Sequence, residues 1–155
     1  MVMSHSSIPP HSLTCDVSQS IVEQLQDIVD TTLAVEFYPE KPATYRLNHA
    51  NGALLVNYAR SNYPKHNETG AVIRPRTMIL TVTIVSRGLY DRYGAVPLVD
   101  WVLAMLSGFT PEHADKPLAP IKDYFVQHQS GLWFYGVDFE TEVVHVQSLG
   151  VPQGF

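Results

Sequence analysis

Cysteine is almost absent from this sequence, in which Cys15 is the only example among 155 residues. No intrachain disulfide can form, so a small secreted fold held together by disulfides is excluded. A lone cysteine outside any recognisable motif is more often a small buried side chain than a nucleophile. We therefore expect Cys15 to be buried.

Long apolar runs are missing as well. No segment approaches the roughly 20 apolar residues that a membrane-spanning helix needs. The first residues also lack the basic segment and the continuous apolar segment of a secretory signal. We therefore expect a protein that is made and kept in a reducing cytoplasm and has no membrane partner.

Charge is scarce. Charged residues make up 16% of the sequence, against roughly 25% in an average soluble domain. We interpret this deficit as surface that other subunits cover. A compact monomer with a neutral polar surface would have the same composition, so composition alone leaves that alternative open.

The charges that are present fall in three blocks. Residues 1–40 contain six acids and no lysine or arginine, residues 41–92 contain eight bases and two acids, and residues 93–155 contain seven acids and two bases. If the blocks lie on different faces, one copy of the chain can attract another head to tail. If they meet within one fold, they neutralise one another.

Motifs for catalysis and cofactor binding are also absent. The sequence has no phosphate-binding G-x-x-x-x-G-K-[ST] loop, no dinucleotide-binding G-x-G-x-x-G loop and no G-x-S-x-G nucleophile elbow. None of the seven histidines has another at the i, i+4 spacing of a helical metal site. We therefore expect no catalytic residue, no metal and no cofactor.

Two groups of polar residues remain as candidates for chemistry. A proline-flanked segment contains Glu112, His113 and Asp115, which we interpret as a solvated loop. Further along the chain, acids alternate with apolar residues and would share one face of a strand. These acids are Asp138, Glu140 and Glu142. Three carboxylates could bind a divalent cation, but such alternation is more typical of a half-buried strand.

Hydrophobic periodicity predicts two helices. Ser20 and Glu23 fit a capping box at the start of a helix over residues 20–33. Pro97 suits the first residue of a second helix, and Gly108 suits its end. The preceding residues, 1–15, are rich in serine, histidine and proline. We expect them to form a flexible arm ahead of a single domain over residues 16–155.

Runs of alternating or β-branched residues predict the strands. We expect strands over residues 35–38, 53–58, 76–85, 124–128 and 132–140, with a further short strand over 143–146. The long connections over residues 60–73 and 109–120 are predicted to be irregular. Two helices packed on one face of a mainly antiparallel sheet would make an α+β two-layer sandwich.

Five groups of segments have the order and spacing of a known family. They are residues 21–25 running into 35–39, 51–58 followed by 61–63, 86–89 with Gly94, 106–111, and 131–139. Together they resemble the tail terminator (tail-completion) proteins of long contractile-tailed phages and Mu-like prophages. The resemblance spans roughly residues 20–142, and its specificity rests on the order of the segments rather than on any single motif.

The resemblance implies a structural protein without catalytic residues. Its copies would form a hexameric ring that caps the finished tail tube, ends tube polymerisation and joins the tail to the neck and head. The implied partners are copies of itself, the tail tube protein, and a neck, connector or sheath protein, with DNA only passing through the ring. The implied location is the virion, after assembly in the host cytoplasm.

Particular residues become candidates for these contacts. Bases of the middle block are candidates for the contact between subunits: Arg60, Arg74, Arg76 and Arg87. The alternating acids are candidates for the surface of the central lumen: Asp138, Glu140 and Glu142.

Two other functions remain open from the sequence. One is another neck or sheath-associated component of a contractile tail, which would have similar sequence features and differ in the tail protein that it binds. The other is a small metal-dependent hydrolase. That activity would require distant polar residues such as Glu112, His113 and Asp138 to meet in one pocket.

Overall fold

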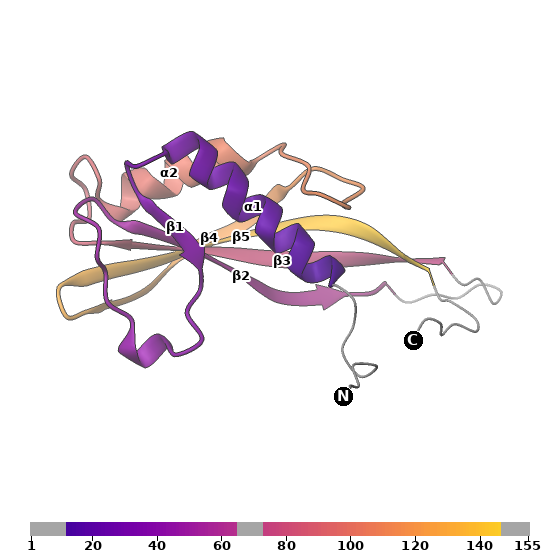
Figure 1. Ribbon diagram of the computed structural model, residues 1–155, viewed down its shortest axis with the longest axis horizontal. Coiled ribbons are helices and arrows are strands. Elements are labelled where there is room, and N and C mark those ends of the chain that lie inside the picture. The colour runs from indigo at the N-terminus through magenta and orange to yellow at the C-terminus, as the bar shows by residue number, and fades with distance from the viewer. Residues whose placement is uncertain (1–11, 65–72, 147–155) are drawn as a thin grey trace, which may run out of the picture.

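A computed structural model describes residues 12–64 and 73–146 (Figure 1). The elements are α1 (Leu13–Val29), β1 (Ala34–Phe37), a short 3₁₀ helix η2 (Pro42–Thr44), β2 (Ala53–Asn62), β3 (Ile73–Ser86), α2 (Ala95–Leu106), β4 (Ala119–Gln129) and β5 (Leu132–Val146). The strands form one sheet in the order β1-β2-β3-β5-β4, and only the β1–β2 pair is parallel. The predicted α+β class is confirmed.

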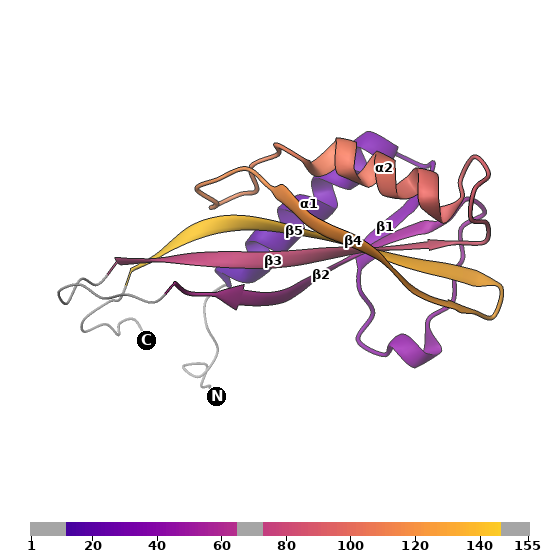
Figure 2. The same ribbon diagram turned by 180° about the vertical axis from the view of Figure 1, so that it is seen from behind.

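Both helices cover the same face of the sheet (Figures 1 and 2). In α1, apolar residues at helical spacing face inward, and in β3 and β5 every second residue does so. Together they build the main core, whose fully buried side chains include Val17, Ile21, Leu25, Leu80, Leu106 and Phe139. The opposite face of the sheet, which neither α1 nor α2 covers, is called the open face below.

Helix α1 begins earlier than the sequence predicted. Its N-cap is Ser12, whose hydroxyl oxygen accepts a hydrogen bond from the Cys15 N–H at 3.1 Å. The predicted cap Ser20 lies inside the helix, where its hydroxyl donates to the Val17 carbonyl at 2.8 Å. The apolar stripe continues backwards from Ile21 through Val17, which is why the first turns form. Residues 1–11 of the predicted arm lie outside the described residues.

Two further expectations need correction. Cys15 is exposed rather than buried. Helix α2 is capped by Gly94 and starts at Ala95, two residues before Pro97. Gly108 does have the positive φ, +88°, of a helix stop.

The strands are longer than predicted. β2 extends to Asn62 and β3 begins at Ile73, which shortens the predicted 60–73 connection from both ends. β4 begins at Ala119 inside the segment predicted to be irregular. β5 is one continuous strand rather than two, because it pairs with β3 along the whole length of β3. The β4–β5 turn at residues 130–131 has the positive φ values expected of a tight hairpin.

The open face has a small core of its own at one end of the sheet. Its fully buried members are Ala53, Leu55 and Val85. The long connection over residues 38–51 hangs below the sheet at this end (Figure 1), and its residues Tyr45 and Leu47 pack against this cluster. Among the described residues, the open face is therefore covered at one end only.

Candidate assembly surface

The four candidate arginines differ in their surroundings. Arg60 is exposed on β2 and pairs in register with Ile79 of β3. Arg74 lies in β3, where its main chain pairs with that of His145. The other two, Arg76 and Arg87, make hydrogen bonds within the chain. Their guanidinium groups therefore stabilise the subunit itself.

Arg76 joins the start of α1 to the sheet. Its Nε donates to Ser61 Oγ at 2.9 Å and its Nη2 donates to Thr14 Oγ1 at 2.8 Å. The guanidinium carbon also lies 5.7 Å from the centre of the Tyr58 ring. The hydrogen bond between the Tyr58 and Ser61 hydroxyls, with help from Arg76, lowers the pKa of the Tyr58 hydroxyl below its usual value.

Replacing Arg76 by alanine is expected to lower the free energy of unfolding by about 1–2 kcal/mol, because two hydrogen bonds and the cation–π contact are lost. Chemical denaturation followed by circular dichroism measures the change. Arg60→Ala is the matched control, because Arg60 is exposed and should change stability by less than about 0.5 kcal/mol. Equal losses in the two variants would contradict this assignment.

Arg87 holds the connection over residues 38–51 in place. Its Nη1 donates to the carbonyl oxygens of His49 and Ala50 at 2.6 and 3.1 Å, and its Nη2 donates to that of Leu47 at 3.3 Å. Between this connection and the tip of the β4–β5 hairpin lies a pocket of about 590 Å³ on the open face. Burial, and then the nearby Glu36 carboxylate, raise the pKa of Tyr45 in its lining.

The alternating acids share the open face as predicted, but their environments differ. Asp138 is only 5% exposed, and its Oδ1 accepts hydrogen bonds from the Thr81 and Tyr124 hydroxyls at 2.7 and 2.8 Å. A Cβ at Gly136 would lie 2.6 Å from the Tyr124 ring, so the glycine leaves room for that ring. Burial, and then the bond to Asp138, raise the pKa of Tyr124.

The burial of Asp138 corrects its assignment to the lumen surface. Its carboxylate joins β3, β5 and β4 instead of facing solvent. Glu140 is exposed, and Glu142 is half-buried with a carboxylate oxygen 3.4 Å from Lys116 Nζ. Of the three alternating acids, only Glu140 and Glu142 offer negative charge on the open face, and Glu36 of β1 is exposed at its other end.

The residues of the hydrolase alternative do not meet. His113 lies beside Asp16 and Glu112, with its Nε2 at 3.5 and 3.7 Å from their carboxylates. Asp138 instead contacts Thr81 and Tyr124 on the open face. Within residues 12–64 and 73–146, no group of three or more His, Cys, Asp or Glu side chains could hold a metal ion.

The sequence pattern did not predict the exposed edge of the sheet. β4 is the edge strand beside β5, and nearly all of its residues are exposed. Its register slips between Pro120 and Lys122 and again between Phe125 and Gln127. Such bulges discourage uncontrolled pairing with another strand. A partner at this edge would therefore bind mainly through side chains.

An aromatic patch lies on this hairpin, consisting of Phe125 and His128 of β4 with Trp133 and Tyr135 of β5. The His128 and Trp133 rings stack at 4.0 Å, and the Phe125 ring lies 5.6 Å from that of Tyr135. Phe125 is 53% exposed. Exposed aromatic side chains that are already ordered are typical of protein–protein contacts. Figure 2 shows the hairpin extending past the end of α2.

Comparison with known proteins bears on the class of the protein. In the part of the chain that the structure describes, no helix is long and apolar enough to span a membrane. The fold is similar to that of a chain in the virion of a native gene transfer agent (GTA) particle. The TM-score is 0.56 at 9% sequence identity, over 86% of this chain and 98% of that chain. At this identity the similarity establishes a shared α+β fold.

The sequence comparison identifies the family. The family model described as Gp37 protein matches residues 21–154. The chain therefore belongs to the Gp37 protein family. No curated protein matches the sequence.

Proposed function

We propose that the protein is a structural subunit of a phage virion, without enzymatic activity, that assembles as a ring on the end of the tail tube. In this position it ends tube polymerisation and joins the tail to the neck and head. The Gp37 family membership and the fold shared with a GTA virion chain support a virion protein. The family resemblance of the sequence supports the position at the tube end.

The observation that carries the proposal is the exposed β4 edge with its aromatic patch. Three apolar side chains project from it at 43–53% exposure: Ile121, Phe125 and Val126. In a free monomer, an edge of this length with exposed apolar side chains is a liability because it favours aggregation. Coverage by another subunit or by the tube protein removes that liability.

Two of the alternating acids fit passage of DNA through the ring. Of the three alternating acids, Glu140 and Glu142 keep contact with solvent on this face, which the exposed Arg60 and Lys122 share by register, and like charge keeps DNA from binding to a lumen. Glu140 lies six residues beyond Phe134 along β5, roughly 20 Å from the pocket end of the strand. We therefore propose that the half of the open face around Glu140 borders the lumen.

The test is the mass of the purified protein by light scattering after size exclusion, with negative-stain images of the same fraction and of tail tubes mixed with it. We expect hexameric rings, or a monomer that forms caps on tube ends. A monomer that leaves tail tubes uncapped would overturn the proposal. Binding to the sheath or neck but not to the tube would favour the neck-component alternative.

A further inference from the structure

The pocket on the open face has a distinct chemical character. Its floor is apolar and includes Leu55, Leu132 and Phe134. The charged residues that line it are Arg46 and Arg87, and Glu36 lies outside the lining but near Tyr45. Arg46 is exposed and has no ion-pair partner among the described residues. The pocket therefore suits an apolar side chain flanked by carboxylates.

The end of the connection over residues 38–51, next to the pocket residue Leu47, is already ordered in the isolated chain. Besides the three Arg87 hydrogen bonds, the His49 ring nitrogen Nε2 lies 2.8 Å from the Thr31 carbonyl oxygen. Asn51 Nδ2 donates to the Thr32 carbonyl oxygen at 3.0 Å. Binding there would cost little ordering of the connection over residues 38–51.

The C-terminal end of α1 has the complementary character. Asp27 and Asp30 lie there and the last turn has no basic residue, although the helix dipole favours positive charge at this end. Neither carboxylate has an ion-pair partner among the described residues. Ile28, between them in sequence, is 43% exposed. These acids and the exposed apolar side chain are therefore unfavourable for the stability of the isolated subunit.

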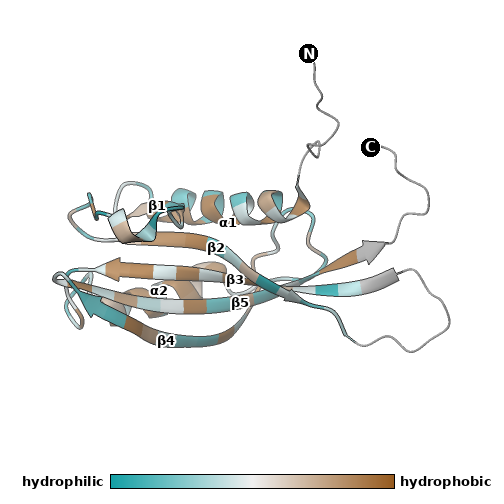
Figure 3. Cartoon of the chain, turned by 90° about the horizontal axis from the view of Figure 1, so that it is seen from below, coloured by the Kyte–Doolittle hydropathy of each residue, from teal (hydrophilic) through white to brown (hydrophobic). Residues whose placement is uncertain are grey.

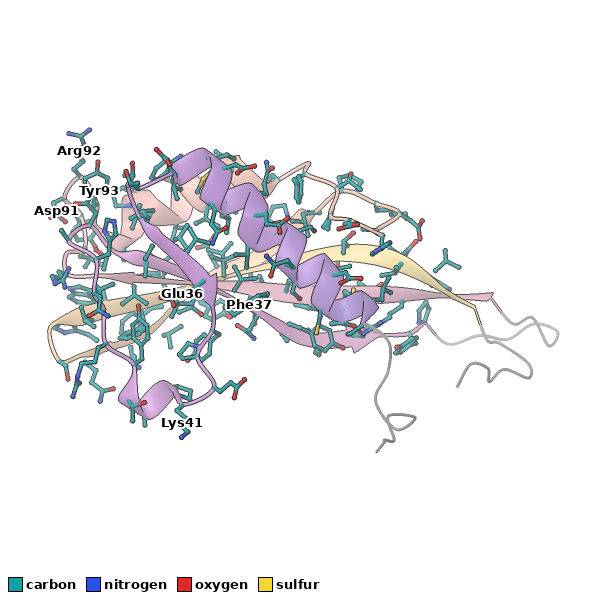
Figure 4. All side chains as sticks on the ribbon, in the orientation of Figure 1. Glu36, Phe37, Lys41, Asp91, Arg92 and Tyr93 are labelled. Atoms are coloured by element: carbon teal, nitrogen blue, oxygen red, sulfur yellow. The ribbon has the colours of Figure 1, made fainter. Side chains whose placement is uncertain are left out.

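The two surfaces lie on opposite sides of the sheet. Helix α1 lies above the sheet, and Lys41 of the connection over residues 38–51 lies below it (Figure 4), while the end of this connection contacts Thr31 and Thr32 just after α1. Unlike surfaces on opposite sides of a subunit can meet only head to tail, and head-to-tail contacts generate rings when the rotation closes.

We propose that the C-terminal end of α1 in one copy docks in the pocket of the next copy, with Ile28 on the apolar floor and Asp27 and Asp30 facing Arg46 and Lys41. The inference rests on the proposed ring. It identifies the repeating contact between subunits and leaves the aromatic patch free for the tail tube.

Charge exchange tests the contact. Asp27→Lys with Asp30→Lys, and separately Lys41→Glu with Arg46→Glu, are each expected to raise the concentration needed for assembly by about tenfold at low salt. Combining all four substitutions restores the attraction between the two surfaces. The concentration needed for assembly is then expected to fall most of the way back to the wild-type value. Asp27→Lys alone should also melt at a higher temperature as a monomer, because a lysine suits the last helical turn, whereas Asp30 is the cap residue with a positive φ of 51°. A variant that merely unfolds cannot give this result.

Asp100→Lys on α2 is the matched control, since Asp100 is an exposed acid of the helix layer outside α1. It should assemble like the wild type. Assembly is measured both as rings in solution and as caps on tail tubes. If the wild type assembles and the charge variants assemble equally well, the docking inference is wrong while the proposed function stands. If the wild type neither forms rings nor caps tubes, the proposed function fails and the inference with it.

Cross-linking gives a second, independent measurement. In a Cys15→Ser background, Asp30→Cys and Arg46→Cys in one chain should be joined between copies by a short bis-maleimide, giving a ladder of multimers. Mixed single-cysteine variants should give dimers only. Rings that form without any cross-link between these positions would overturn the inference.

Discussion

Replacing Asp138 by alanine is expected to lower the free energy of unfolding by about 3 kcal/mol, because the Thr81 and Tyr124 hydroxyls both donate to its carboxylate. Without that acceptor, the buried Thr81 hydroxyl loses its partner and the Tyr124 ring is released from the surface of Gly136. The loss should affect the β3–β5–β4 half of the sheet. Urea denaturation followed by circular dichroism measures it.

Asp138→Asn separates the hydrogen bonds from the charge. Both hydroxyls bond to the same carboxylate oxygen, Oδ1, and the asparagine side chain keeps an oxygen at this position. We expect this variant to lose only about 1 kcal/mol. If asparagine is as destabilising as alanine, the negative charge matters more than the acceptor, and the assignment to a hydrogen-bonded sheet contact would be wrong.

Replacing Phe125 by alanine is expected to weaken assembly by at least about 30-fold, which corresponds to about 2 kcal/mol for a central aromatic contact. The side chain is 53% exposed in the isolated chain and contacts mainly Trp133 and Tyr135. Its removal should therefore leave the folded subunit intact. The measurements are the yield of capped tail tubes, the yield of rings, and the thermal unfolding midpoint.

Tyr90→Ala is the control for Phe125, because Tyr90 is an aromatic residue that is 77% exposed on the β3–α2 connection. It should assemble normally if the effect belongs to the patch rather than to any exposed ring. Loss of tube capping with intact rings would assign the patch to the tube protein. Loss of both would assign it to the contact between subunits. Normal capping by Phe125→Ala would contradict an assembly role for β4.

Much of the fold follows from local pattern. The apolar spacing around Ile21 and Leu25 predicts α1, and the β-branched run of β3 predicts its central strand. The figure coloured by hydropathy shows the alternation along the strands directly (Figure 3). The helix boundaries are less predictable. Ser12 and Ser20 are both suitable N-cap residues for α1, and the local sequence does not distinguish between them. Packing of Val17 into the core decides in favour of Ser12.

The candidate site was predictable only in part. Period-two alternation correctly placed three acids on one face, but burial of Asp138 depends on Tyr124, which lies 14 residues away on another strand. Arg76 and Arg87 were equivalent to Arg60 in sequence. Their partners Thr14 and His49 lie 62 and 38 residues away, so no local pattern could reveal them. The exposed edge follows from strand order, which is a property of the whole sheet.

The sequence by itself determined the class of fold, the scarcity and three-block distribution of charge, and the resemblance to a family of tail proteins. These are properties of composition and of short-range periodicity, which the chain carries whether folded or not. Only the tertiary structure decided which charges are available for assembly. In the folded chain, Asp138, Arg76 and Arg87 make internal hydrogen bonds, whereas β4 and the acidic end of α1 stay exposed. These differences depend on contacts between residues far apart in the chain, which local sequence does not determine.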